Sequence, residues 1–431
     1  MNKNSIKSLS FLWLGSLLGS GSTFVIYVLL ARYLGVEEFG IFSSAIAIIT
    51  VLSLISGFGV SQAWLKHFGK EGWNAVRWIS ASFKLATISI FIVLFILIIW
   101  ATFGPNDLES KKILYILSFF IIGQMITELV SVKFQLEENY SYLALWQVLP
   151  NLLRLSIICF FVYIFQYKSF DVITVAYIYS CVAIVFILIG INQLLKMKKY
   201  EFDLKGHGNK IMNFTKIPNI KETFSHSWAF GLGNIFAFIY LQSDIIMLKY
   251  ISGNEAAGYY NVGFIIISAI LIFPTVLYSK FLMPKYHRWV NQDKNKFYEY
   301  YKKGNLLMFV FGMIFLIFVL IFSDFFIPIL FGQEYVKSIL FVQILSISLP
   351  IYFVAYSVGA TLVTKEYMKY KVQLMGITGL VNIILNAILI PLYSEIGAAI
   401  ATIVSNLILL MFYYIVAEKK IFKKDLYVEN Y

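Results

Sequence analysis

Three ionisable residues lie well inside long apolar stretches of this chain. Arg154 falls in the run 142–165, Asp244 falls in the run 227–250, and Glu128 falls in a third such run. A charged side chain at the centre of a bilayer costs about 2.5–3.5 kcal/mol on the insertion scale, so such residues form ion pairs or line functional cavities. If these runs cross a membrane, the chemistry of the protein is expected at membrane depth.

Arg154 is the deepest cation, and no charged residue three or four positions away neutralises it. It follows Pro150 and Asn151 in the same run. Its planar guanidinium presents forked donors that match phosphate oxygens, which predicts contact with an anionic diphosphate group in a cavity. The alternatives are an ion pair with Glu128 or Asp244 on another helix, and a side chain that reaches towards the headgroups.

The two acids have two interpretations of their own. Asp244 and Glu128 either pair with a basic residue or bind a coupling ion, H⁺ or Na⁺, that drives transport. All four histidines fall in or beside loops, so no buried imidazole relay is expected. A coupling ion would therefore need one of these carboxylates, together with neighbouring amide and backbone oxygens.

Further polar residues could complete a binding cavity. Lys84, Arg32 and Lys249 lie near the ends of apolar runs, with Arg32 and Lys249 at matching positions of the two halves. Each of them either anchors its helix at the headgroups or helps to neutralise a diphosphate. Amides inside the runs could bind sugar hydroxyls, although amides also cross-link membrane helices. Those singled out are Asn151, Asn382 and Asn386.

The composition places all these residues in a polytopic membrane protein. Hydrophobic residues make up 60% of the 431 positions and charged residues 13%, too little polar material to cover a soluble globule. The net charge of +12 comes from Lys and Arg in short loops, where they set orientation, so no nucleic-acid partner is expected. Cys159 and Cys181 show no metal-binding or disulfide spacing, and neither a metal nor another cofactor is predicted.

Twelve apolar runs are long enough to cross about 30 Å of hydrocarbon as helices. They are 9–31, 41–63, 80–103, 113–134, 142–165, 171–195, 227–250, 259–282, 304–326, 336–362, 371–392 and 396–417. Most Lys and Arg residues fall on one side of these spans, and the other side holds only Arg32, Lys111, Lys112, Lys168, Lys249 and Lys337. The positive-inside rule then predicts that both termini are cytoplasmic. The outer loops are too short for a catalytic domain, so an enzyme is not expected.

The chain is predicted to divide at residues 196–225, a basic stretch interrupted by Gly and Pro that we interpret as a cytoplasmic hinge loop. It separates an N-terminal lobe at 1–195, with spans 1–6, from a C-terminal lobe at 226–417, with spans 7–12. Residues 418–431 form a basic cytoplasmic tail. Weak echoes between the halves predict an all-α membrane fold of two six-helix lobes related by a pseudo-twofold axis along the membrane normal.

Several segments resemble the oligosaccharide-lipid flippases of bacterial O-antigen and capsule pathways, the Wzx-like family of the multidrug/oligosaccharidyl-lipid/polysaccharide exporter superfamily. These segments look like turn and packing chemistry, so they imply the MATE-like fold of that superfamily more directly than they imply a binding site. They are Ala31–Gly40, Gln242–Val262, Ile329–Tyr335, Asn386–Pro391 and Gly397–Thr402.

The resemblance implies a membrane transporter that flips polyprenyl-diphosphate-linked oligosaccharide repeat units across the bacterial cytoplasmic membrane by alternating access. The product would be O-antigen lipopolysaccharide, capsule or exopolysaccharide, and the partners would include membrane lipids, polysaccharide polymerase and chain-length proteins. The alternative is an ion-coupled multidrug or cation exporter of the same fold. Such an exporter should have a cavity dominated by acids, whereas the deepest charge here is Arg154.

Overall fold

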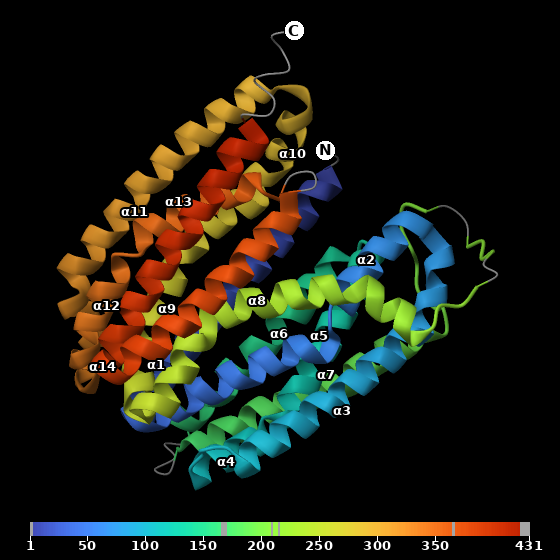
Figure 1. The fold of residues 1–431 in the computed structure, drawn as a ribbon. Coiled ribbons are helices and arrows are strands. Elements are labelled where there is room, and N and C mark those ends of the chain that lie inside the picture. The colour runs from blue at the N-terminus through green and yellow to red at the C-terminus, as the bar shows by residue number, and fades with distance from the viewer. Residues whose placement is uncertain (1–2, 165–169, 208–209, 214–215, 364–366, 423–431) are drawn as a thin grey trace. The chain divides into compact units, whose positions relative to one another are not determined.

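The computed structural model describes residues 3–164, 170–207, 210–213, 216–363 and 367–422, and the regular secondary structure in these ranges is helical, with no strand. The helices are α1 (Lys3–Gly57), α2 (Val60–Glu71), α3 (Ile79–Phe103), α4 (Leu108–Ile116), α5 (Ser118–Leu136), α6 (Tyr140–Cys159), α7 (Val172–Lys198), α8 (Ile220–Ser252), α9 (Asn254–Val276), α10 (Met283–Gln292), α11 (Lys294–Leu330), α12 (Ser338–Ser346), α13 (Leu349–Thr361) and α14 (Met368–Val416) (Figure 1). Short 3-10 turns at Gly72–Trp78 and Gln333–Lys337 and π-helical turns at Phe160–Ile164, Leu277–Leu282 and Ala417–Phe422 extend them. The predicted all-helical class is confirmed.

Helix is the expected conformation for these sequences because lipid offers no partner to backbone N–H and C=O groups. Several helices begin at an acidic cap outside the apolar run. The Asp107 carboxylate accepts a hydrogen bond from the Ser110 backbone N–H at 2.6 Å, and Asp171 and Asp293 cap α7 and α11 in the same way. These caps satisfy N–H groups that the first helical turn leaves without a partner, so they fix where each apolar helix starts.

The described helices cross a membrane many times. Seven continuous helical segments are long and apolar enough to span it, or up to nine when two bent pairs are each counted as one span. The segment Leu14–Phe103 overlaps three of the predicted spans and Met368–Phe422 contains two. Each of the twelve predicted spans therefore has a helical counterpart, and the chain is a multi-pass membrane protein.

Two breaks account for the apparently overlong helices. Gly35 in α1 has φ 75° and ψ 177°, and Ser394 in α14 has φ 50° and ψ −126°. Positive φ values interrupt a right-handed helix and suit glycine, so the serine at 394 is held in a strained conformation. Both breaks fall between predicted spans, as the sequence indicates.

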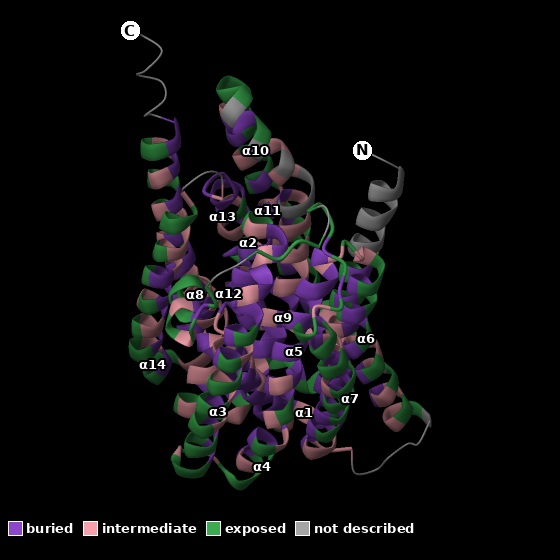
Figure 2. Cartoon of the chain, turned by 90° about the vertical axis from the view of Figure 1, so that its right-hand side faces the viewer, coloured by how far each residue is buried: buried purple, intermediate pink, exposed green. Residues whose placement is uncertain are grey.

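Apolar side chains cover the outer faces of the long helices. Phe91 and Phe95 on α3 and Ile321 and Phe325 on α11 are all exposed. Figure 2 shows exposed residues along α3 and buried residues along helices such as α5 and α9. An outer surface this apolar is suited to contact with lipid acyl chains rather than with water.

The chain forms two compact units. The first contains Met1–Leu34 and Ser44–Ile235, and the second contains Gly35–Ser43 and Phe236–Tyr431. A short segment of α1 therefore belongs to the second unit, and α8 changes unit between Ile235 and Phe236. The predicted lobe and hinge boundaries stay predictions. Residues 208–209, 214–215 and 423–431 of the predicted hinge and tail, and Lys168 of a predicted outer loop, lie outside the described residues.

The linker after α7 packs into the core of the first unit. Phe202 and Leu204 are buried, and the Phe202 ring lies 5.8 Å from Phe68 and 5.3 Å from Trp73 between ring centroids. The Lys205 backbone N–H also donates to the Leu136 carbonyl at 3.1 Å. Residues 202–205, in the first part of the predicted hinge, thus pack against the first unit, and we call this segment the strap.

Segments that carry the family resemblance meet in the second unit. Gly40 lies so close to the Asn254 carbonyl that a Cβ atom would overlap it, and a Cβ atom on Gly258 would overlap the Val36 carbonyl. Gly40 follows the first predicted span as Gly258 follows the seventh, so the two contacts are reciprocal. A local twofold relation of this kind is what an internal repeat predicts.

The surrounding contacts follow the same pattern. The Asn261 amide donates to the Ser43 hydroxyl at 2.6 Å, and the Phe39 ring packs edge-on against Tyr335 at 6.1 Å. Gly253 has φ 99° and ψ 175°, close to the values of Gly35. We call the contacts of Gly40 and Gly258 and the residues around them the glycine junction. Its close packing explains why these segments are rich in glycine and aromatic residues.

Candidate functional site

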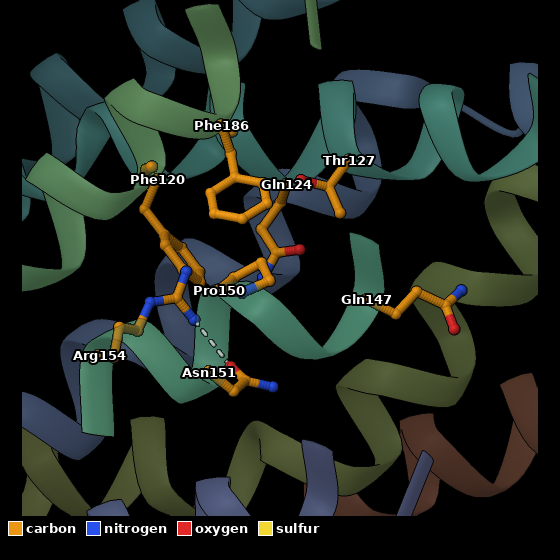
Figure 3. A pocket seen from close by; sticks show the side chains of 10 residues that line it. Phe120, Gln124, Thr127, Gln147, Pro150, Asn151, Arg154 and Phe186 are labelled. Carbon is orange, nitrogen blue, oxygen red and sulfur yellow. Dashed lines mark hydrogen bonds between the residues drawn. The ribbon is translucent and has the colours of Figure 1, made fainter. Parts of the chain in front are cut away.

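Helix α6 places Arg154 and Asn151 one turn apart on the same face. Pro150 lies inside this helix and removes one backbone hydrogen bond, since proline has no N–H. The Arg154 Nη1 donates to the Asn151 Oδ1 at 3.0 Å. Figure 3 shows this bond and the Phe120 ring beside the guanidinium.

In the described first unit, aromatic rings rather than acids lie beside Arg154. Its side chain is buried, and its guanidinium carbon lies 4.8 Å from the Phe120 ring centroid and 4.7 Å from that of Tyr179. Such cation–π contacts offset part of the cost of removing a guanidinium from water. None of the ion pairs in the described part of the first unit includes Arg154, and its Nε has no hydrogen-bond partner. The residue thus keeps unused donor capacity.

A cavity of about 100 Å³ adjoins the guanidinium (Figure 3). At about 30 Å³ for each water molecule it holds roughly three waters, or one small anionic group, but not a whole oligosaccharide. Its lining combines amide and hydroxyl groups with aromatic rings and small residues. The lining residues are Phe120, Gly123, Gln124, Thr127, Gln147, Pro150, Asn151, Arg154, Ala183 and Phe186.

Glu128 has neutral partners in the described structure. Its Oε1 accepts hydrogen bonds from the Ser61 hydroxyl at 2.5 Å and from the Gln62 amide at 3.1 Å. Both donors come from α2, just after the turn that ends α1. The two predicted roles of Glu128, charge pair and ion coupling, stay predictions.

Asp244 is the centre of a buried polar cluster in the second unit. Its Oδ2 accepts from the Tyr260 hydroxyl at 2.7 Å and from the Thr402 hydroxyl at 2.5 Å, and its Oδ1 accepts from the Asn386 amide at 2.5 Å. The same Asn386 amide donates to the Asn382 Oδ1 at 3.0 Å. Three residues predicted from the sequence, on α8 and α14, are therefore brought together.

One acceptor in this cluster is left over. The Asn386 Oδ1 is buried and has no hydrogen-bond partner. Carboxylate, amide and hydroxyl oxygens are the ligands that hard cations such as Na⁺ or Ca²⁺ use. No group of three or more His, Cys, Asp or Glu residues that could hold a metal ion occurs among the residues described.

The remaining predicted residues lie elsewhere. Lys84 on α3 and Arg32 on α1 are exposed, and neither lines the cavity beside Arg154. Lys249 on α8 is buried, with its Nζ 5.6 Å from the Tyr250 ring centroid. Their predicted contribution to substrate binding stays a prediction.

Sequence reasoning missed the neutral residues of both clusters. Phe120 and Tyr179 carry no local signal, because 18% of the chain is aromatic. Tyr260 and Thr402 fall inside segments that were interpreted as turn and packing motifs. The polar character of those two residues within apolar runs was the available signal.

Comparison with known proteins places the chain in a family. The model of the family described as "Polysaccharide biosynthesis protein" matches residues 5–289. The capsular polysaccharide biosynthesis protein CapF of Staphylococcus aureus is 22% identical over 95% of this chain and 98% of its own. The probable low-salt glycan biosynthesis flippase Agl15 of Haloferax volcanii is 22% identical over 94% of this chain and 80% of its own.

Solved structures show the same fold. The lipid II flippase MurJ in an inward closed conformation superposes with a TM-score of 0.74 at 16% identity, covering 96% of this chain and 88% of that one. A multidrug resistance MATE family transporter in an inward-facing conformation gives a TM-score of 0.72 at 14% identity, over 98% of this chain and all of that one. The family match spans more than half of the sequence, so the chain belongs to the polysaccharide biosynthesis protein family and has the helical fold of MurJ and the MATE transporters.

Proposed function

We propose that this protein flips polyprenyl-diphosphate-linked oligosaccharide repeat units across the bacterial cytoplasmic membrane by alternating access. The product would enter O-antigen, capsule or exopolysaccharide assembly. The family match, the capsular and glycan relatives and the fold of a lipid II flippase support this function. Both termini are proposed to be cytoplasmic. A polymerase and chain-length proteins would act on the repeat units after flipping, on the opposite side of the membrane.

The observation that carries the proposal is the state of Arg154. A buried guanidinium beside a cavity, with aromatic neighbours and no carboxylate partner in the described first unit, is arranged for an anion that arrives from outside the protein. Phosphate oxygens accept forked hydrogen bonds from such a group. One guanidinium cannot neutralise a diphosphate, so Lys84, Arg32 or Lys249 would contribute during the transport cycle, and amides would hold the sugars.

The Asp244 cluster would bind the coupling ion. Its carboxylate, the unused Asn386 oxygen and the Thr402 hydroxyl offer oxygens to H⁺ or Na⁺. A drug or cation exporter of the same fold is the alternative function. It is less well supported because the cavity beside Arg154 carries a cation, which repels cationic drugs.

Arg154→Ala tests the proposal in a strain from which the gene for this protein has been deleted. We expect loss of surface polysaccharide at normal membrane abundance, because the diphosphate loses its guanidinium. Arg154→Lys keeps the charge but loses the fork, so partial export is expected. Ser156→Ala is the matched control and should keep export, since it changes an exposed residue of the same helix that does not line the cavity.

Double variants separate substrate binding from ion pairing. If Arg154 served to pair with an acid, Arg154→Ala would be poorly folded, and Asp244→Ala or Glu128→Ala in the same chain would restore it. We expect no such rescue. Full polysaccharide assembly by Arg154→Ala at normal abundance would refute the role of this residue.

A further inference from the structure

A second pocket lies in the first unit, away from the long apolar helices. It has a volume of about 450 Å³ and is formed by the turn between α2 and α3 and by the linker that follows α7. Its lining residues are Lys70, Glu71, Gly72, Trp73, Asn74, His207, Ile211 and Asn213. Nothing in the proposed translocation mechanism uses this pocket.

The acceptor groups of the turn are already occupied. The Glu71 carboxylate is bound by Arg77, whose Nη2 lies 3.0 Å away, and by the Trp78 indole N–H at 3.3 Å. The Asn74 Oδ1 accepts the Asn213 backbone N–H at 2.8 Å. These acceptors are therefore not offered to a ligand.

The donors of the pocket are not occupied in the same way. In the part of the chain that the structure describes, Lys70 and His207 have no hydrogen-bond or ion-pair partner. The Trp73 indole N–H is buried without an acceptor, although it belongs to a residue of the lining. The bond from Asn213 to the Asn74 Oδ1 leaves the Asn74 amide hydrogens available. A pocket with free donors and used acceptors favours an anion.

The backbone and the linker give this pocket a defined shape. Gly72 has φ 56°, and a Cβ atom there would lie 3.2 Å from the His207 Nδ1. The Lys210 ammonium lies 5.3 Å from the Trp73 ring centroid and donates to the Tyr200 carbonyl at 2.5 Å. These contacts tie the linker to the α2–α3 turn, so Lys70, Asn74 and His207 line the same pocket.

We propose that this pocket binds a phosphate-bearing anion. Lys70 and His207 would contact its oxygens, and the Asn74 amide would orient it. The anion comes either from a soluble phosphate compound or from the headgroup of an acidic phospholipid. The proposal is independent of the translocation function, because it concerns different residues and a different measurement.

Binding of inorganic diphosphate to the purified full-length protein tests the proposal. The protein is placed in nanodiscs of zwitterionic phosphatidylcholine, and the affinity is measured by calorimetry. Lys70→Ala or His207→Ala removes a charge-assisted hydrogen bond to the anion and should weaken binding about tenfold or more. Lys196→Ala, which removes an exposed lysine outside the pocket, should leave the affinity unchanged.

A second arm identifies the source of the anion. Nanodiscs that contain phosphatidylglycerol should compete with diphosphate if the natural ligand is a lipid headgroup, and they should leave its affinity unchanged if the ligand is soluble. The proposal is wrong if diphosphate does not bind in phosphatidylcholine nanodiscs. It is also wrong if binding survives both pocket substitutions and is lost in Arg154→Ala, since the anion would then occupy the cavity in α6.

Discussion

Within the described first unit, Arg154 shows how a membrane protein can keep a cation at depth without an acid beside it. The guanidinium lies against Phe120 and Tyr179 and bonds to Asn151, so its desolvation is offset by ring faces and one amide. A carboxylate partner would have consumed the forked donors. The ring faces leave the Nε without a hydrogen-bond partner, and under the proposed function it is available to an anionic substrate.

If Asp244 binds a coupling ion as proposed, Asp244→Asn should abolish ion-driven export. The amide keeps the volume of the side chain but supplies no negative charge for a cation, so surface polysaccharide should fall at least tenfold. The residual export should no longer depend on external pH or sodium. The measurement is surface polysaccharide in the deletion strain over a range of pH and sodium concentration, scored with membrane abundance.

Ser243→Ala is the control for that substitution. It removes only the hydrogen bond of 2.7 Å to the Asn382 Oδ1 and should keep most of the export. Normal, ion-dependent export by Asp244→Asn would exclude this carboxylate from coupling.

The charged and amide residues of each candidate site were predicted from the sequence, and the aromatic and hydroxyl residues were not. A charge or amide inside an apolar run is rare, which is why Arg154, Asp244 and Asn386 stand out. Phe120 and Tyr179 become partners of Arg154 only because three helices pack together. That packing is a tertiary property with no local sequence pattern.

At the scale of elements, the glycine junction of the second unit is a sharp packing constraint. Gly40→Ala and Gly258→Ala each place a methyl group against a backbone carbonyl, which cannot retreat like a side chain. Overpacking of this kind costs about 1–3 kcal/mol. We expect lower membrane abundance and a lower melting temperature in detergent for both variants.

Gly21→Ala in α1 is the matched control, since nothing lies within 4 Å of the Cβ atom it would add. It should be neutral or slightly stabilising, because alanine favours helix over glycine. Equal stability of Gly40→Ala and Gly21→Ala would contradict the junction.

The breaks and the linker show which elements the sequence could and could not place. Gly35 and Ser394 both fall in gaps between predicted apolar runs. The sequence indicates these gaps because a loop must leave the hydrocarbon. The strap at Phe202 and Leu204 was not predicted, since two apolar residues in a basic stretch carry little signal. Its burial depends on rings of α2 and the following turn that are far away in the sequence.

For the whole molecule, the distribution of basic residues predicts orientation. Reporter domains fused after Lys210 and Lys303 should be cytoplasmic, and those fused after Asn106 and Asn254 should be external. The measurement is the activity of reporters that function on only one side of the membrane. An external signal after Lys210 would overturn both the orientation and the count of spans.

Because Gly35–Ser43 belongs to the second unit, this segment can pack only after the second unit has been synthesised. This segment leaves the ribosome long before its partners at Asn254, Gly258 and Tyr335 exist. At about 5–20 residues per second the delay up to Tyr335 is roughly 15–60 s. During that time the first unit, up to and including Phe202, can assemble without residues 35–43 of α1. A nascent chain halted before Tyr335 would therefore display Phe39 and Gly40 to any chaperone or protease that inspects unfinished membrane proteins.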